Sequence, residues 1–286
     1  MEKIQAAIAK ARATRNEAEP ATPPVTAPAP VATPAAAVQP LTPAPEAPAS
    51  DAAWQALPRV TPDPAQLQRS RVIAAEAGTE ALPFDVIRTR MLQQMRANNW
   101  KRVAITSPDP GCGKSMVALN LAFSLARQPE QRTILFEIDL RRPKLARYLG
   151  LPARHDISRV LEGSAPFADH ALRLGDNLAI ATQTHPMRSP AELLQGAAVA
   201  DALAAVDADH APSVMLFDLP PMQAGDDVMA FIGHVDAVLI VAAADMTTIK
   251  QIDHCERDLA SQCQVMGVVL NKCRYFDDMP NYDYGY

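Results

Sequence analysis

The sequence Arg102-Val-Ala-Ile-Thr-Ser-Pro-Asp-Pro-Gly-Cys-Gly-Lys114-Ser115 decides the fold of this chain. The apolar run at its start predicts a β-strand, and the residues after Ser115 have the apolar spacing of a helix. Between them, Gly111 and Gly113 allow backbone N–H groups to wrap around phosphate oxygens at the positive end of the helix. Lys114 suits the β- and γ-phosphates, and the Ser115 hydroxyl suits Mg²⁺. The stretch therefore predicts a strand–loop–helix unit that binds ATP with Mg²⁺.

Short apolar segments alternate with helical segments downstream of this loop. Further strands are predicted at residues 133–139, 178–181, 214–218, 237–242 and 266–270, and helices at 84–98, 191–206 and 247–261. Such alternation predicts an α/β fold in which a mostly parallel, doubly wound sheet is covered by helices on both faces. Together with the phosphate loop, it predicts a P-loop NTPase.

The N-terminal part of the chain has a different composition. Residues 20–64 contain 13 of the 26 prolines and little aromatic content. Such a segment buries too little apolar surface to offset the entropy lost on ordering. We therefore expect a short helix at residues 1–15, a disordered Pro/Ala-rich linker at 16–75, an ATPase domain at 76–273 and a tyrosine-rich tail at 274–286.

Charge and cysteine content limit the class of protein. The net charge of -5 argues against nucleic acid as a partner. No apolar run reaches the roughly 18 to 20 residues of a membrane span, and the N-terminus lacks the apolar region of a signal peptide. The four cysteines lack the paired spacing of a zinc site. These features predict a cytoplasmic protein.

Two predicted strands end in an aspartate. Asp139 closes the strand at 133–139, and Asp218 closes the strand at 214–218. In a parallel sheet, the carboxyl ends of the strands gather at the edge where the phosphate loop lies. Carboxylates at that edge can hold Mg²⁺ or accept a proton from a nucleophile. Both residues are therefore candidate catalytic and metal-binding groups.

The C-terminus is rich in tyrosine. Four of the five tyrosines lie in the last twelve residues, at Tyr275, Tyr282, Tyr284 and Tyr286. Their neighbours are mainly Asp, Asn and Gly, so these rings have little with which to form a core. The tail can be read either as the phosphate acceptor of the ATP site or as a disordered segment without that role.

Several motifs, taken in order, resemble those of the bacterial tyrosine kinases of exopolysaccharide and capsule export. The phosphate loop with Asn120-Leu-Ala resembles that family's Walker A region, and Glu137-Ile-Asp-Leu-Arg141-Arg142-Pro its second acidic motif. Pro190-Ala-Glu-Leu-Leu194 resembles the PxELL segment, Asp218-Leu-Pro-Pro221 the Walker B motif, Asp227 a further family aspartate, and Gly267-Val-Val-Leu-Asn271 the strand whose Asn contacts adenine. The tyrosine-rich end resembles the autophosphorylated tail.

The resemblance implies an ATP- and Mg²⁺-dependent tyrosine autokinase that regulates polysaccharide polymerisation and export. It implies that the catalytic residues are Lys114, Asp139, Glu137 and Asp218, and that Mg²⁺ is bound by Ser115, Asp139 and Asp218. It implies that the nucleotide is bound by Gly111, Cys112, Gly113, Lys114, Ser115, Met116 and Asn271. The phosphate acceptors would be the four tail tyrosines. It also implies a membrane-anchored co-polymerase or chain-length partner, a second copy for phosphorylation of the tail in trans, and a tyrosine phosphatase. Such a kinase would be cytoplasmic and peripheral to the inner membrane through its partner.

The sequence also departs from that family. The ExxRxxR helix associated with ring formation reads Leu82-Pro-Phe-Asp-Val-Ile-Arg88, Glu137 replaces the first aspartate of the second motif, and Met116 follows Ser115. These departures leave an alternative, a non-kinase ATPase switch of the partitioning type that regulates a membrane-associated assembly. Those ATPases carry a signature lysine five residues before the loop lysine, where this chain has Asp109. That difference favours the kinase.

Overall fold

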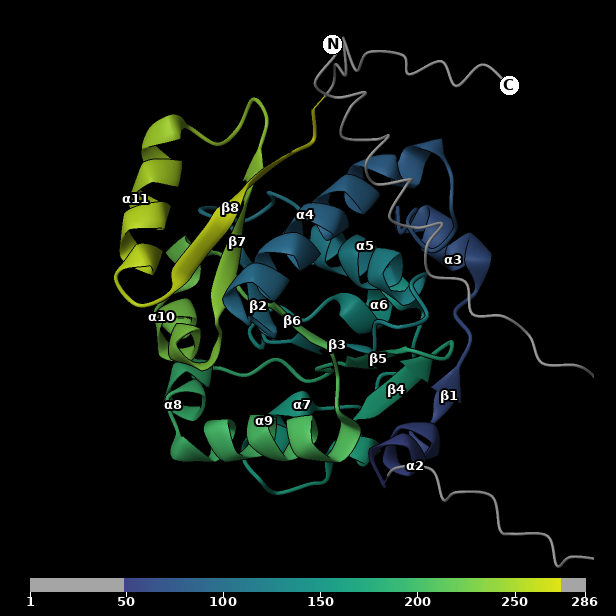
Figure 1. Ribbon diagram of the computed structural model, residues 1–286. Coiled ribbons are helices and arrows are strands. Elements are labelled where there is room, and N and C mark those ends of the chain that lie inside the picture. Colours follow the sequence, from purple (N-terminus) through teal and green to yellow (C-terminus); the bar gives the residue numbers. More distant parts are fainter. Residues whose placement is uncertain (1–48, 274–286) are drawn as a thin grey trace, which may run out of the picture. The chain divides into compact units, whose positions relative to one another are not determined.

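A computed structural model describes residues 49–273 of the chain, so the predicted helix at 1–15, part of the linker and the tail lie outside the described residues. Within 49–273, eight strands form one sheet of order β1-β4-β5-β3-β6-β2-β7-β8 (Figure 1). The strands are β1 (Arg59–Val60), β2 (Arg102–Thr106), β3 (Thr133–Glu137), β4 (Ala171–Leu174), β5 (Leu178–Ala181), β6 (Val214–Asp218), β7 (Ala237–Ala243) and β8 (Gln264–Asn271). Among these eight strands of residues 49–273, only the β4–β5 pair is antiparallel.

Helices cover both faces of the sheet, as the alternating pattern predicts. One face packs against α3 (Pro64–Arg69), α4 (Leu82–Asn98), α5 (Lys114–Ala126) and α6 (Leu145–Leu149). The other packs against α2 (Ala49–Ala56), α7 (Ile157–Leu161), α8 (Pro190–Leu194), α9 (Ala197–His210), α10 (Asp227–Phe231) and α11 (Ile249–Ala260). Figure 1 shows α5 and α6 above the sheet and α7 and α9 below it. The predicted P-loop NTPase fold is confirmed.

The central strands bring the sequence motifs to one edge of the sheet. β2 lies between β6 and β7, with Ile105 opposite Asp218. β3 pairs with β6 in parallel, so that Glu137 also lies opposite Asp218. All three strands end on the side where the loop after β2 begins. This register gives the acidic motifs and the phosphate loop a common edge.

Most predicted elements agree with the structure, with three differences. The predicted helix at 191–206 is two helices, α8 and α9, separated at Gln195 and Gly196. The strand predicted at 133–139 ends at Glu137, because the chain turns there and the backbone N–H groups of Ile138 and Asp139 both bond to the carbonyl of Asp218. The antiparallel strand β4 and the short helices α6, α7 and α10 are absent from the prediction.

The folded part of the chain also begins earlier than residue 76. Residues 49–75 carry α2, β1 and α3 in place of the predicted linker. Trp54, on α2, has 1% of its surface exposed, and its indole N–H donates to the carbonyl of Asp176 over 2.7 Å. The guanidinium of Arg132 lies 5.0 Å from the centre of the same ring. Trp54, together with the buried Leu57, Leu67 and Val72, therefore anchors a segment whose proline content predicts disorder.

Candidate nucleotide site

The loop between β2 and α5 has the backbone of a phosphate-binding loop. Gly111 and Gly113 have φ angles of 88° and 94°, a region that side chains other than hydrogen strongly disfavour. A Cβ on Gly113 would also lie 2.2 Å from the amide nitrogen of Asn271. That amide donates to the carbonyl of Cys112 over 2.8 Å. The resemblance assigns Asn271 to the adenine; in the structure its side chain braces the loop from β8.

Lys114 lies between the two aspartates that the strand ends predict. Its ammonium Nζ is 2.8 Å from Asp139 Oδ2 and 3.5 Å from Asp218 Oδ1. Burial favours the neutral amine, but the carboxylates of Asp218 and Asp139 outweigh burial and raise the pKa of Lys114. The lysine is therefore held as a buried cation, ready to exchange a carboxylate for a phosphate.

The chemistry of the site fits Mg²⁺ bound together with a nucleotide. Asp218 is 1% exposed; apart from the ion pair of Oδ1 with Lys114, neither carboxylate oxygen has a well-formed hydrogen bond within the described residues. Burial raises the pKa of Asp218, against the charge of Lys114. Buried carboxylate oxygens without donors are suitable ligands for Mg²⁺ or for its water shell, and a hydroxyl from Ser115 completes the usual set. Ser115 Oγ lies 3.4 Å from Lys114 Nζ.

The resemblance gives Glu137 a catalytic role, and the structure places its carboxylate behind the wall of the site, among backbone N–H groups. Its carboxylate accepts hydrogen bonds from the backbone N–H groups of Lys144 (2.5 Å), Leu145 (2.7 Å) and Gln183 (2.9 Å). The side chain is fully buried and does not line the cavity beside Lys114. These three backbone donors fix the Glu137 carboxylate beside the start of α6. Because Lys144, at that start, lines the cavity, Glu137 helps to position this wall of the site.

Burial also makes Glu137 sensitive to pH. It raises the pKa of Glu137 to about 7, although the N–H groups of Leu145, Gln183 and Lys144 lower it. A carboxyl whose folded pKa lies above its unfolded value stabilises the fold fully below about pH 4.5 and loses that contribution as the pH rises through about 7. We expect the free energy of unfolding to fall by about 1 kcal/mol more between pH 6 and 8 in the wild type than in Glu137→Gln. Urea denaturation across this range checks it; parallel pH profiles would contradict it.

A cavity of about 490 Å³ lies in front of the phosphate loop. Besides the loop, its lining includes side chains that the sequence analysis did not assign: Arg142, Lys144, Tyr148 and Lys272. Met116 lines it as well, whereas the Cys112 side chain is fully buried and its Sγ lies 3.5 Å from Thr247 Oγ1. Lys144 and Tyr148 follow Asp139 within nine residues. This proximity in sequence could have indicated that they lie near the site, but it does not show that their side chains line the cavity.

The two arginines of the second acidic motif have different environments. Arg141 is held by Asp227 through two hydrogen bonds of 2.5 and 2.8 Å, and it donates to the carbonyl of Arg188. Arg142 is exposed at the cavity. Both arginines line the cavity, but the Arg141 guanidinium is already bound by Asp227, so Arg142 is the better placed to contact a phosphate or an acidic acceptor.

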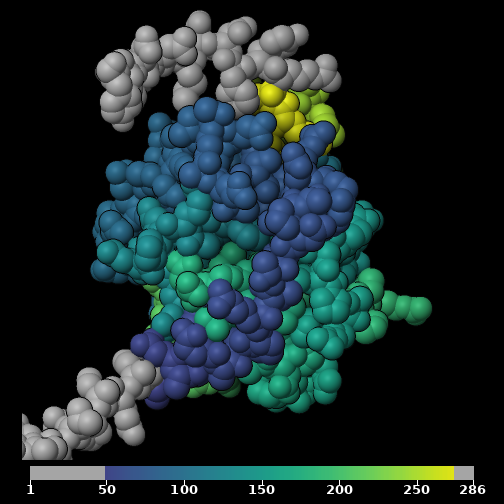
Figure 2. Space-filling view, turned by 90° about the vertical axis from the view of Figure 1, so that its right-hand side faces the viewer, coloured from purple at the N-terminus to yellow at the C-terminus, as the bar shows by residue number. Residues whose placement is uncertain are grey.

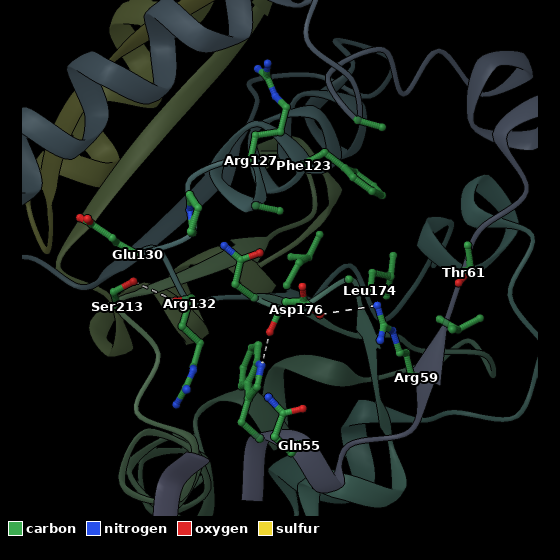
Figure 3. A pocket seen from close by; sticks show the side chains of 18 of the residues that line it. Gln55, Arg59, Thr61, Phe123, Arg127, Glu130, Arg132, Leu174, Asp176 and Ser213 are labelled. Atoms are coloured by element: carbon green, nitrogen blue, oxygen red, sulfur yellow. Dashed lines mark hydrogen bonds and ion pairs between the residues drawn. The ribbon is translucent and has the colours of Figure 1, made fainter. Parts of the chain in front are cut away.

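A larger cavity, of about 750 Å³, lies at the opposite edge of the sheet (Figure 3). It is lined by three arginines, each already paired with a carboxylate: Arg59 with Asp176, Arg127 with Asp85, and Arg132 with Asp51. Its cationic charges are therefore neutralised, and it is remote from Lys114. The phosphate loop and Lys114 line the smaller cavity, which is therefore the candidate nucleotide site.

Comparison with known proteins identifies the family. A model of the ParA family, described as NUBPL iron-transfer P-loop NTPase, matches residues 99–281. The chain is 28% identical over 203 residues to the putative tyrosine-protein kinase EpsB of Ralstonia nicotianae, a match that covers 70% of this chain and 26% of EpsB. It is 27% identical over 191 residues to the tyrosine-protein kinase YwqD of Bacillus subtilis, covering 66% of this chain and 79% of YwqD.

Solved structures agree with these matches. The VpsO kinase domain has a TM-score of 0.60 and 28% identity, over 68% of this chain and 96% of that domain. The kinase domain of the Escherichia coli tyrosine kinase ETK has a TM-score of 0.64 and 24% identity, over 73% and 82% of the two chains; it supports the fold. This chain spans about a quarter of the length of EpsB. It belongs to the ParA family of P-loop NTPases, and it is similar in sequence to the tyrosine-protein kinases named above.

Proposed function

We propose that this chain is an ATP-dependent protein-tyrosine autokinase that phosphorylates its own C-terminal tyrosines. One juxtaposition carries the proposal. Lys114 lies between two carboxylates in front of the loop, and Lys272, which lines the same cavity, immediately precedes Cys273, where the described chain ends. The tyrosine-rich segment therefore continues from a residue at the mouth of the site. The names of the relatives as tyrosine-protein kinases support the same reaction.

The residues of the site divide the work of phosphoryl transfer. Ser115 and Asp218 would hold Mg²⁺, which would supply positive charge next to the nucleotide phosphates. Lys114 leaves Asp139 and binds the γ-phosphate, which frees the Asp139 carboxylate to orient a tyrosine hydroxyl. The tyrosine oxygen forms its bond to phosphorus as the bond to the ADP oxygen breaks, and Asp139 takes the proton. A tyrosine with a pKa near 10 needs this positioning at neutral pH.

Partners follow from the same proposal. A membrane-anchored co-polymerase or chain-length protein would activate the kinase and link it to polysaccharide export, and a tyrosine phosphatase would reverse the modification. No helix among residues 49–273 is long and apolar enough to cross a membrane. The kinase would act at the cytoplasmic face of the inner membrane through that partner. A second copy would present its tail in trans.

One contact bears on the alternative of a non-kinase ATPase switch. Asp109, at the position of the signature lysine of the partitioning ATPases, accepts a hydrogen bond of 2.5 Å from Gln251 of α11. Gln251 also completes the capping box of that helix with Thr248. An acidic side chain fixed in this way cannot supply a cation to a nucleotide bound by a second subunit. The observation favours a kinase over a nucleotide-sandwich switch.

Phosphotyrosine mapping by mass spectrometry tests the proposed function. We expect phosphate on Tyr275, Tyr282, Tyr284 or Tyr286 in protein isolated from its native cells during polysaccharide synthesis. Because the chain has five tyrosines, a variant with these four changed to phenylalanine retains only Tyr148 as an acceptor. Phosphotyrosine should fall below detection in that variant. An unmodified tail in the wild type would favour the ATPase switch.

A further inference from the structure

The segment that precedes α4 crosses the molecule from one edge of the sheet to the nucleotide site. We call residues 49–75 the strap. Figure 2 shows it as a purple-to-blue band running over the teal and green surface. It starts at the cavity of Figure 3, where Arg59 lies 3.5 Å from Asp176. It then pairs β1 with β4 and continues through α3 toward α6. The strap therefore connects the edge of the sheet at the larger cavity with the edge at the nucleotide cavity.

The first contact of the strap with the nucleotide site is made by Gln66 of α3. Its amide Nε2 donates to the carbonyls of Arg147 (3.1 Å) and Tyr148 (3.2 Å), the last turn of α6. The side chain also packs on Gly150, where a Cβ would lie 3.1 Å from Gln66 Cγ and where φ is 66°. The Arg147 carbonyl also accepts the N–H of the C-cap residue Gly150 over 3.3 Å, but carbonyls at the end of a helix lack the donors of a following turn, and Gln66 supplies a donor to both. Gln66 thus acts as a remote cap for α6.

Both ends of α6 are therefore held by distant side chains. Glu137 accepts the N–H groups of Lys144 and Leu145 at its start, and Gln66 donates to the carbonyls at its end. A helix of five residues has too few internal bonds to be stable alone. Since Lys144 and Tyr148 line the nucleotide cavity, the two caps decide where that wall of the cavity lies.

The second contact is made by Asn120, which is fully buried on the phosphate-loop helix α5. Its Oδ1 accepts the N–H groups of Ile73 (2.8 Å) and Ala74 (2.9 Å), and its Nδ2 donates to the carbonyls of Arg71 (3.1 Å) and Met116 (2.9 Å). All four hydrogen-bonding positions of the amide are used. One side chain therefore joins the strap to the first turn of the helix that begins at Lys114.

From these contacts we propose that the strap positions the nucleotide site, with Gln66 and Asn120 as its positioning residues. The strap holds the wall formed by α6 through Gln66 and the phosphate-loop helix through Asn120. Neither residue lines the cavity, so neither touches the nucleotide. The segment outside the predicted ATPase domain is thus part of what sets its nucleotide affinity. This inference rests on the nucleotide site and does not require phosphorylation of the tail.

The test replaces Gln66 without changing its size. In Gln66→Glu a carboxylate faces two carbonyl oxygens where an amide donated. We expect the amides of Tyr148 and Leu151 to exchange hydrogen about 5- to 20-fold faster, because a lost bond and added repulsion open α6 locally. We expect the affinity for a fluorescent ATP analogue with Mg²⁺ to fall roughly 3- to 10-fold. Gln66→Lys, which keeps a donor, should restore both values to within about twofold of wild type.

Asn177→Asp is the matched control. Asn177 also donates from its amide to two carbonyls, those of Gln128 and Gln131, but at the opposite edge of the sheet. The Asn177→Asp variant should lower the free energy of unfolding as much as Gln66→Glu does, and it should leave the affinity for the ATP analogue unchanged. Unchanged exchange in α6, unchanged affinity in Gln66→Glu, or an equal loss of affinity in Asn177→Asp would each overturn the proposal. Since all readouts are binding and exchange, an unphosphorylated tail would refute the kinase and leave this result standing.

Discussion

Lys114→Met should abolish nucleotide binding and tail phosphorylation together. Lys114 is the cation at the loop, and its ammonium is shared by Asp139 and Asp218. Without it, a nucleotide phosphate would approach two buried carboxylates with no compensating charge. We expect ATP affinity to fall on the order of 100-fold or more, and phosphotyrosine to become undetectable. Calorimetric titration with ATP and Mg²⁺ and phosphotyrosine mapping measure the two effects.

The same substitution should weaken the fold. Removing one partner of a buried ion pair leaves an uncompensated charge, which typically costs about 3 to 5 kcal/mol unless protonation relieves it. Lys101→Met is the matched control, because Lys101 pairs with Asp207 at a site whose side chains are 36% and 29% exposed. A partly exposed pair contributes only about 0 to 1 kcal/mol. Equal losses of stability in the two variants, or normal phosphorylation in Lys114→Met, would contradict the role given to Lys114.

Asp139→Asn should separate binding from chemistry. The amide no longer attracts the Lys114 ammonium by charge, so ATP should bind as well as in the wild type or a few-fold more tightly. The same amide cannot take a proton from tyrosine. We expect the rate of tail phosphorylation to fall by roughly 10² to 10⁴. Measured side by side, unchanged ATP affinity and a lost rate would identify Asp139 as the catalytic base.

Asp207→Asn provides the control for this second variant. Like Asp139, Asp207 accepts a lysine ammonium, but it lies on α9, far along the chain from the phosphate loop. It should leave both affinity and rate as they are. An Asp139→Asn protein that phosphorylates its tail at the full rate would refute the assignment. A protein that loses ATP binding as well would move Asp139 to a binding role alone.

The sequence determined the fold class because its decisive features are local. Alternating apolar runs predict a parallel sheet, and Gly111, Gly113, Lys114 and Ser115 predict a phosphate loop through backbone freedom and charge alone. Asp218 follows from the rule that parallel strands end at one edge. These inferences need only neighbours in sequence and the handedness of connections. Residues 102–126 and the acidic strand ends therefore identified the nucleotide site without any knowledge of packing.

Tertiary structure decided which groups the polar side chains bind, because the periodic spacing of apolar residues does not encode hydrogen-bond partners. The Glu137 carboxylate accepts three backbone N–H groups, two of them at the start of α6, and the Asn271 amide donates to the Cys112 carbonyl of the loop. Asp85, where the ring-forming motif has an arginine, binds Arg88, Ser124 and Arg127 of its own chain.

The strap shows the same limit most clearly. Its prolines predict disorder from composition, yet Trp54 is buried and Gln66 meets carbonyls 81 and 82 residues away. A hydrogen bond across such a separation forms only after the sheet and its helices have brought both ends together. Local sequence therefore specified the elements and the chemistry of the loop, and long-range contacts alone specified which side chains hold that loop in place.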